Sequence, residues 1–253
     1  NPTKKYGGLI AFHKLEDFWD SLLPEEREFI RDCYASTLSS GNRNTKHLDD
    51  PRVHVTSTQS SSGFLLNYSS RAISRKKYKL ADKLLQEAIK RKTNNIDLHF
   101  TYNQLIDLCY ERRDEGSEWL ERCIEYCLED IKIFPDFKRE YLSEERARRV
   151  RLVESPFIDD KERQTRIKEV KDIAFDLQIP SFHILATIYE EQGKYEEAIE
   201  ICKLAINYGL KDSTENGYEE RIARLTEKIE SLDAEGTKEE VKEEVIEEIK
   251  KNQ

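Results

Sequence analysis

Residues 180–209 read PSFHILATIYEEQGKYEEAIEICKLAINYG, and this stretch decides the fold. Apolar residues recur at helical spacing over 182–189 and again over 198–206, which predicts two amphipathic helices. Gly193 stands between them, where a helix ends easily because glycine adopts the left-handed backbone conformation without strain. Two helices joined by so short a turn lie antiparallel, so the stretch predicts a helix hairpin.

This hairpin resembles a tetratricopeptide repeat. Ala186, Ala198 and Ala205 stand at the small positions, where the two helix backbones approach closely. The departures are Cys202, where an aromatic residue is usual, and Leu210, where the family often has proline. The other matching positions are aromatic, leucine and turn residues: Phe182, Leu185, Tyr189, Gly193 and Tyr195. The resemblance implies a stack of several such hairpins.

Weaker copies of the pattern occur earlier in the chain. Residues 65–92 hold Tyr78, Ala81, Leu85 and Ala88 at second-helix positions, with Lys76 in place of the turn glycine. A third copy has a first helix at 97–112, followed by Cys123, Cys127, Ile131 and Pro135. Residues 218–232 carry one apolar face and resemble the polar capping helix of such arrays. The whole chain resembles uncharacterised bacterial proteins with a divergent array of this kind behind a short helical N-terminal segment.

The expected fold is all-α: antiparallel helix-turn-helix repeats stacked as an α-α superhelix, with an N-terminal helical pair and a C-terminal capping helix. We expect an N-terminal helical segment at 1–40, a polar loop at 41–63, the repeat array at 64–232 and an acidic amphipathic helix at 233–253. In that last helix Thr237 and Glu240 form a capping-box pattern. The polar loop holds few apolar side chains, so we expect it to be mobile and outside the packed core.

Composition places the chain among folded proteins with highly charged surfaces. Charged residues make up 37% of the 253 residues, and the formal net charge is −9. No stretch approaches the roughly 20 consecutive apolar residues of a membrane-spanning helix, and the first residues do not resemble a secretory signal. We therefore expect a cytoplasmic protein without membrane contact. The sequence contains no methionine, as expected of a fragment or of a sequence that has lost residues.

No pattern in the sequence indicates catalysis, a metal or a cofactor. The glycines form no phosphate-binding loop. Cys123 and Cys127 could share a helix face as metal ligands, but both fall on an apolar stripe and read as buried core residues. His47 and His54 could gather around a metal with neighbouring aspartates, but a polar loop is a poor cage. We expect no catalytic residues, no metal and no cofactor.

Positive charge concentrates between residues 71 and 92, where nine basic residues face only Asp82 and Glu87. The ordinary interpretation is a solvated helix face. The functional one is a basic patch that binds an acidic peptide or phosphates. Nucleic acid is disfavoured because aromatic residues are not interleaved with the charges and the net charge is negative. The patch consists of Arg71, Arg75, Lys76, Lys77, Lys79 and Lys83.

The resemblance implies a protein- or peptide-binding module whose groove is lined by the first helix of each repeat. The groove positions that it implies are Leu66, Ser70, Ile73, His183, Thr187, Glu190 and Glu191. Two alternatives stay open: a peptide-sensing regulator with an N-terminal effector segment, and an enzyme whose site is assembled on the array. The narrow stripe Val241, Val245 and Ile249 predicts that the C-terminal helix docks on its own array or on a second copy.

Overall fold

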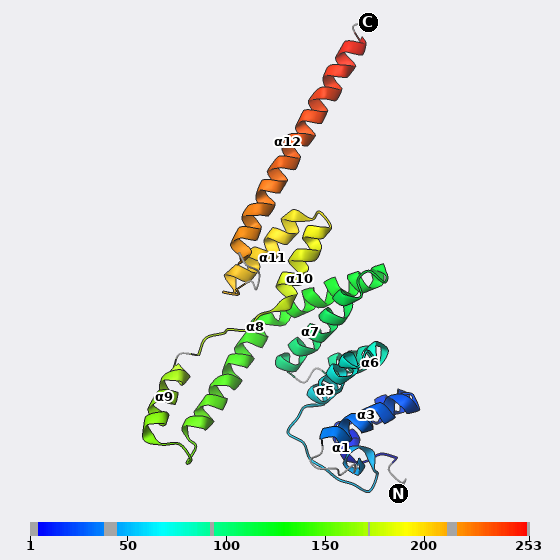
Figure 1. Ribbon diagram of the computed structural model, residues 1–253, viewed down its shortest axis with the longest axis vertical. Helices are drawn as coiled ribbons and strands as arrows, with labels where there is room; N and C mark the ends of the chain where they lie inside the picture. The colour runs from blue at the N-terminus through cyan, green and yellow to red at the C-terminus, as the bar shows by residue number, and fades with distance from the viewer. Residues whose placement is uncertain (1–4, 38–44, 92–93, 172, 212–216, 252–253) are drawn as a thin grey trace. The chain divides into compact units, whose positions relative to one another are not determined.

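The protein is described by a computed structural model in which every element of regular structure in the described residues is a helix (Figure 1). The description covers residues 5–37, 45–91, 94–171, 173–211 and 217–251, with side chains up to residue 234. The helices are α1 (Gly8–Phe12), α2 (Glu16–Ser21), α3 (Pro24–Thr37), α4 (Lys46–Asp49), α5 (Ser61–Ser74), α6 (Tyr78–Arg91), α7 (Asn95–Glu111), α8 (Ser117–Val153), α9 (Asp160–Lys171), α10 (Pro180–Glu191), α11 (Tyr195–Asn207) and α12 (Gly217–Lys251). The all-α prediction is confirmed.

The chain divides into two compact units, Asn1–Ile173 (unit 1) and Ala174–Gln253 (unit 2). The division falls inside the range 64–232 that was expected as one array. Unit 1 contains helices α1 to α9, and unit 2 contains α10 to α12. Each unit is therefore described by itself.

The N-terminal helices share one hydrophobic core with α5 and α6. Trp19 of α2 and Ile30 of α3 are fully buried in the same cluster as Leu65 of α5 and Leu84 of α6. Large apolar side chains buried together hold these helices to the repeat because their burial removes apolar surface from water. The N-terminal segment is thus an integral part of unit 1.

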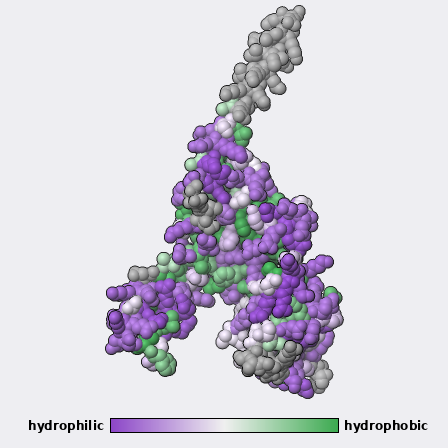
Figure 2. Space-filling view, viewed as in Figure 1, coloured by the Kyte–Doolittle hydropathy of each residue, from purple (hydrophilic) through white to green (hydrophobic). Residues whose placement is uncertain are grey.

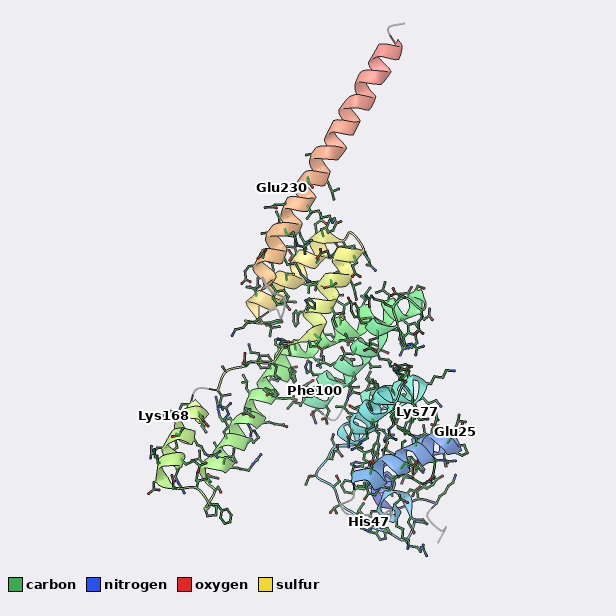
Figure 3. The ribbon with its side chains drawn as sticks, viewed as in Figure 1. Glu25, His47, Lys77, Phe100, Lys168 and Glu230 are labelled. Carbon is green, nitrogen blue, oxygen red and sulfur yellow. The ribbon has the colours of Figure 1, made fainter. Side chains whose placement is uncertain are left out.

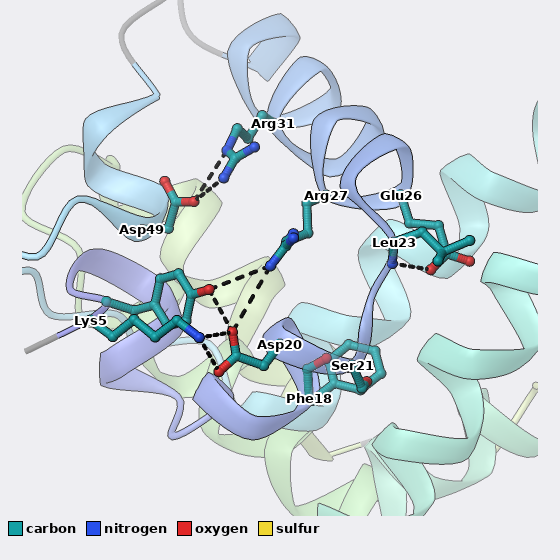
Figure 4. A network of polar contacts seen from close by, with 10 residues as sticks. Lys5, Phe18, Asp20, Ser21, Leu23, Glu26, Arg27, Arg31 and Asp49 are labelled. Atoms are coloured by element: carbon teal, nitrogen blue, oxygen red, sulfur yellow. Dashed lines mark hydrogen bonds and ion pairs between the residues drawn. The ribbon is translucent and has the colours of Figure 1, made fainter.

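Polar contacts tie the same helices together at the surface (Figure 4). The Arg31 guanidinium of α3 donates to the Asp49 carboxylate of α4, with a shortest distance of 2.7 Å. Asp20 of α2 accepts from Lys5 at 2.7 Å and from the Tyr6 hydroxyl at 2.6 Å. Hydrogen bonds from Lys5 and Tyr6 hold the pKa of Asp20 below its usual value. Exposed pairs of this kind add little to stability because water screens them, so they orient helices that the core holds.

The range 41–63, expected as a polar loop outside the core, is partly helical and packed. It contains α4 and the start of α5, and Leu48 is fully buried. The Gly8 amide donates to the Val53 carbonyl at 2.8 Å, so this segment lies directly against α1. Gly8 has φ +54, and a Cβ there would lie 2.3 Å from the His47 carbonyl oxygen, so only glycine fits. The expectation is wrong for residues 45–60, because backbone hydrogen bonds and one leucine anchor them; residues 38–44 lie outside the description.

Helices α5 and α6 form the first hairpin, and its turn has the geometry of the matched repeat in unit 2. Lys76 takes the left-handed conformation, with φ +57, and Gly193 has φ +72 at the corresponding turn. In both turns the following amide reaches back five residues: Lys77 to the Ala72 carbonyl and Lys194 to the Tyr189 carbonyl, each at 2.8 Å. This is the Schellman arrangement that ends helices. Lys76 therefore does fill the glycine position, as the weaker match predicted.

Helices α7 and α8 form the second hairpin, and α8 is much longer than the sequence indicated. Its 37 residues run through Pro135 to Val153. Proline removes one helical hydrogen bond and often ends or kinks a helix. Here Phe134 and Phe137, on either side of it, are fully buried and hold the helix on α7. Beyond them α8 continues and turns back into α9.

Unit 2 consists of the hairpin α10–α11 and the long helix α12, which packs on α11. Ala198 and Ala205 are fully buried, as the repeat pattern predicts. The backbone of α12 is continuous from Gly217 to Lys251, so no new helix begins at Thr237 as the capping-box pattern suggested. The side chains of Val241, Val245 and Ile249 lie outside the described part. Every helix in the described residues is too short or too polar to span a lipid bilayer.

Candidate functional site

A groove lies between α5 and α7, the first helices of the two hairpins of unit 1. Its volume is about 420 Å³. α5 supplies Ser70 and Ile73, and α7 supplies Gln104, Asp107, Leu108, Tyr110 and Glu111. The groove therefore has an apolar part and a polar part, as binding sites for peptides and small ligands commonly do.

Gln104 holds the two walls of the groove at a fixed separation. Its amide nitrogen donates to the Ser70 hydroxyl and, at 3.4 Å, to the Leu66 carbonyl oxygen. Its amide oxygen accepts from the Ser69 hydroxyl at 2.7 Å. Ser69 is fully buried, so this anchor is shielded from water. A side chain with both ends bonded to α5 prevents α7 from sliding along α5.

Two carboxyl groups make the α7 wall acidic. Asp107 and Glu111 are one helical turn apart and point to the same face. The pKa of Asp107 is raised, first because the surrounding groove reduces the solvation of its carboxyl group and then because Glu111 is near. Its side chain still reaches solvent. The groove therefore favours a cationic group, since a positive charge would relieve the repulsion between the two carboxylates.

Unit 2 contains the corresponding arrangement between α10 and α12. Arg221 of α12 donates to the His183 carbonyl oxygen at 3.4 Å and to the Thr187 hydroxyl at 3.2 Å. Gln104 makes the same two kinds of contact to Leu66 and Ser70, so Arg221 corresponds to Gln104. The two positions are 117 residues apart, and the same separation relates Lys76 to Gly193 and Ala81 to Ala198. By this correspondence α12 begins where a further repeat would begin.

One position differs between the two arrangements. Arg224 in unit 2 corresponds to Asp107 in unit 1, and Glu190 corresponds to Ile73. Arg224 forms a two-pronged ion pair with Glu190, with distances of 2.5 and 2.9 Å. Hydrogen bonding to Arg224 is the main reason that the pKa of Glu190 is lowered. The ion pair therefore bridges in unit 2 the place where unit 1 has Asp107 opposite Ile73.

The groove residues expected from the sequence fall into two separate sets. Ser70 and Ile73 line the groove of unit 1, and the half-buried Leu66 contributes its carbonyl group. The other four belong to unit 2, where His183, Thr187 and Glu190 contact α12 and Glu191 is exposed. Sequence reasoning did not find the α7 residues Gln104, Asp107 and Glu111. The signal that could have found them is the 117-residue correspondence with Arg221 and Arg224.

The basic patch surrounds a second pocket of about 440 Å³, between α3 and the start of α6. Figure 3 places Lys77 and Glu25, two of its lining residues, close together at one side of unit 1. The ammonium group of Lys77 lies 5.2 Å from the ring centre of Phe29, which forms part of the pocket. The other members are at the rim or already engaged: Lys76 and Lys79 line the pocket, Arg75 also lies over Phe29, Lys83 pairs with Glu26, and Arg71 donates to Ser36.

The structure places the cysteines in the core and two of the candidate histidines at the surface. All five cysteines are free and buried, as expected of core residues. Burial raises the pKa of Cys109 to about 12. His47 and His54 are exposed. Among the residues that the structure describes, no three His, Cys, Asp or Glu side chains gather closely enough to hold a metal ion.

A buried histidine that no sequence motif singled out anchors α7 to α8. His99 and Asp130 are both almost completely buried, with 2.7 Å between Nδ1 and a carboxylate oxygen. The amide nitrogen of Asn103 lies 3.0 Å from the other ring nitrogen of His99. Phe137 stacks on the imidazole with a centroid distance of 3.8 Å. The cluster is enclosed by packed side chains, so we interpret it as an anchor for the α7 wall of the groove.

Comparison with known proteins adds one family and one relative. Residues 179–208 match the tetratricopeptide repeat. The resemblance read from Phe182, Gly193 and Ala198 is thereby confirmed, and the hairpin α10–α11 is the matched repeat. An uncharacterized protein of Aquifex aeolicus (strain VF5) is 23% identical over 230 residues, which cover 89% of this chain and 95% of the relative. No solved structure shows a significant match. The tetratricopeptide motif suggests an interaction module and implies protein partners in general.

Proposed function

We propose that this protein is a peptide-binding module and that the α5–α7 groove of unit 1 is its binding site. The observation that carries the proposal is the composition of the groove. Ile73 and Leu108 offer apolar contact, Asp107 with Glu111 offers negative charge, and the bonds of Gln104 to α5 keep the groove open at a fixed width. A catalytic role lacks comparable support, because the Ser70 hydroxyl in this groove donates to the Leu66 carbonyl oxygen and accepts from the Gln104 amide.

The preferred partner of this groove carries a lysine or arginine beside an apolar residue. Asp107 has a raised pKa, so bringing a cation beside it lowers the free energy of its ionised form. The acidic partner expected from the basic patch would bind at a different surface.

The regulator with a separate N-terminal effector segment is less well supported. That reading requires a distinct folded unit before the first repeat. Trp19 and Ile30 instead lie in the same hydrophobic cluster as Leu65, so the segment and the first repeat share one core. A segment with a shared core cannot move independently without exposing that core to water.

Selection from a random peptide library displayed on phage, with the full chain as bait, tests the proposal. We expect the selected peptides to contain a basic residue next to an apolar one, and their affinities can be measured by fluorescence anisotropy. Replacing Asp107→Asn together with Glu111→Gln should weaken binding at least tenfold, or about 1.4 kcal/mol.

Glu121→Gln is the matched control, since Glu121 is an exposed acid on α8 outside the groove. It should leave the affinity unchanged. Selected peptides that bind the double variant as tightly as the wild type would place the binding site elsewhere.

A further inference from the structure

The hairpin formed by α8 and α9 presents an apolar side chain to solvent at its tip. Phe157 is 95% exposed, far more than any other large apolar residue in the described part of the chain. Figure 2 shows hydrophobic surface at the end of this otherwise hydrophilic hairpin. A fully exposed aromatic residue presents apolar surface that a partner can bury, and its burial would be favourable because it removes that surface from water.

Side-chain hydrogen bonds to backbone groups hold the tip of the hairpin in a defined conformation. The Arg163 guanidinium of α9 reaches back to the carbonyl oxygens of Ser155 and Ile158, at 3.5 and 3.3 Å. Asp159 accepts from the Glu162 amide at 2.8 Å and so caps the start of α9. Arg149 of α8 donates to the Glu169 carbonyl oxygen of α9 at 2.8 Å. These contacts fix the turn while Phe157 points outward.

The surroundings of Phe157 are acidic. Glu154, Asp159, Asp160 and Glu162 lie within five residues of it in the sequence, together with one basic residue, Lys161.

 Arg163 also lies at the tip, where its guanidinium bonds to the Ser155 and Ile158 carbonyl oxygens, so four acidic side chains stand against two basic ones. The tip therefore combines one aromatic anchor with a local excess of negative charge.

The pocket beside the basic patch has the complementary character. Its apolar walls come from Leu23, Phe29, Tyr78 and Leu80, and its basic rim consists of Lys76, Lys77, Lys79 and Arg112. Two carboxylates, Glu25 and Glu26, also line it, and Glu26 is paired with Lys83 at 2.8 Å. With a volume of about 440 Å³ the pocket can accept an aromatic side chain. A central aromatic anchor surrounded by complementary charges is the usual composition of an interaction hot spot.

We propose that the tip of the α8–α9 hairpin of one copy inserts Phe157 into the α3–α6 pocket of a second copy. In Figure 3, Lys168 of α9 and Lys77 at the pocket lie on different sides of unit 1, so the tip does not fill the pocket of its own unit. Tip and pocket are different surfaces, so the contact is head-to-tail. A head-to-tail dimer therefore keeps one free tip and one free pocket, so further copies can add to it and produce rings or longer chains.

Sedimentation velocity of the full chain over a range of concentrations tests the proposal. The wild type should form dimers and larger species as its concentration rises. Phe157→Ser at the tip, or Lys77→Glu with Lys79→Glu at the pocket, should each weaken association at least tenfold. Leu128→Ala is the matched control, because Leu128 is 44% exposed on the same helix α8 but lies outside both surfaces.

Mixing the tip variant with the pocket variant gives the decisive result. Each is deficient alone, but the intact tip of one can enter the intact pocket of the other, so the mixture should form dimers and nothing larger. A wild type that stays monomeric at every concentration, or a mixture that stays monomeric, overturns the proposal. So does flotation with lipid vesicles that depends on Phe157 and not on Lys77, since the tip would then serve a membrane surface.

Discussion

The α5–α7 face of unit 1 and the α10–α12 face of unit 2 share one backbone plan but differ in what lies between the helices. Gln104 and Arg221 join the two helices through equivalent carbonyl and hydroxyl groups. One turn further along, unit 2 is bridged by the pair of Arg224 and Glu190, while unit 1 has an open groove with Asp107 on its wall. The comparison shows that a repeat can be closed or open according to two side chains, with the same helices on either side.

The strongest test of this comparison removes the anchor that positions α7. Asp130→Ala leaves His99 buried without its hydrogen-bond partner, and the loss of a buried hydrogen bond to a carboxylate costs about 1.5–3 kcal/mol. Both tryptophans, Trp19 and Trp119, belong to unit 1, so their fluorescence during urea unfolding reports that unit.

We expect the fluorescence transition of Asp130→Ala to move to much lower urea. Asp130→Asn, which keeps an acceptor for His99, should lose less stability. Equal losses for the two variants would contradict the role of this hydrogen bond.

The next test concerns the closely packed alanines that the two units share. Ala81→Leu and Ala198→Leu each overfill a fully buried site, which costs about 1–3 kcal/mol. Ala81→Leu should shift the tryptophan transition, whereas Ala198→Leu should shift only the part of the circular dichroism transition that comes from unit 2. An unchanged midpoint in either variant would mean that its hairpin is not packed as described.

A smaller effect is expected at the two left-handed turns. Lys76 carries a side chain at φ +57, where residues other than glycine are strained. Lys76→Gly should therefore raise the stability of unit 1 by about 0.5–1 kcal/mol. Gly193→Lys should lower the stability of unit 2 by a similar amount. The effect would come from the backbone conformation alone, because no atom lies within 4 Å of a Cβ placed at Gly193. Urea midpoints followed by fluorescence and by circular dichroism give the two values. Changes of the same sign in both variants would contradict the backbone explanation.

The smallest effect belongs to the ion pair that bridges unit 2. The pKa of Glu190 is lowered in the folded state, so the pair contributes stability above the ordinary glutamate pKa of 4.5 and loses it as the pH falls through the lower folded value. For a partly exposed pair the contribution is about 0.2–1 kcal/mol.

Glu190→Gln should remove this pH dependence. The measurement is the circular dichroism midpoint of unit 2 at neutral pH and below pH 4.5. If the midpoints of wild type and variant differ by the same amount at both pH values, the ion pair adds no stability.

The sequence contained enough information for the helices and for one repeat. The 3.6-residue period over 182–189 and 198–206 identifies two helices, and Gly193 with Ala198 identifies their packing. Local patterns were sufficient because each hairpin joins neighbours in the chain. The length of α8 did not follow from local patterns, since buried aromatic residues on both sides of Pro135 stabilise a helix there that proline alone would often end.

The candidate site was harder to predict because its residues come from segments far apart in the sequence. Gln104 contacts α5 residues more than thirty positions earlier, and no local pattern records that contact. Gln104 and Arg221 both donate to a carbonyl oxygen at equivalent positions, one through an amide and the other through a guanidinium group. A search for identical residues therefore does not pair them. His99 and Asp130 are 31 residues apart and meet only through the packing of α7 on α8.

The five buried cysteines give the molecule a set of internal reporters of local opening. Cys33 lies in α3, Cys109 in α7, Cys123 and Cys127 in α8, and Cys202 in α11. The α7–α8 hairpin of unit 1 therefore carries three thiols and the α10–α11 hairpin of unit 2 carries one. An alkylating reagent reacts with the exposed thiolate, and burial holds these thiols away from it. The rate at which each cysteine is labelled in the native protein therefore measures how often its own helices separate. Mass spectrometry of the labelled peptides would then rank the hairpins by their resistance to opening, without introducing any probe.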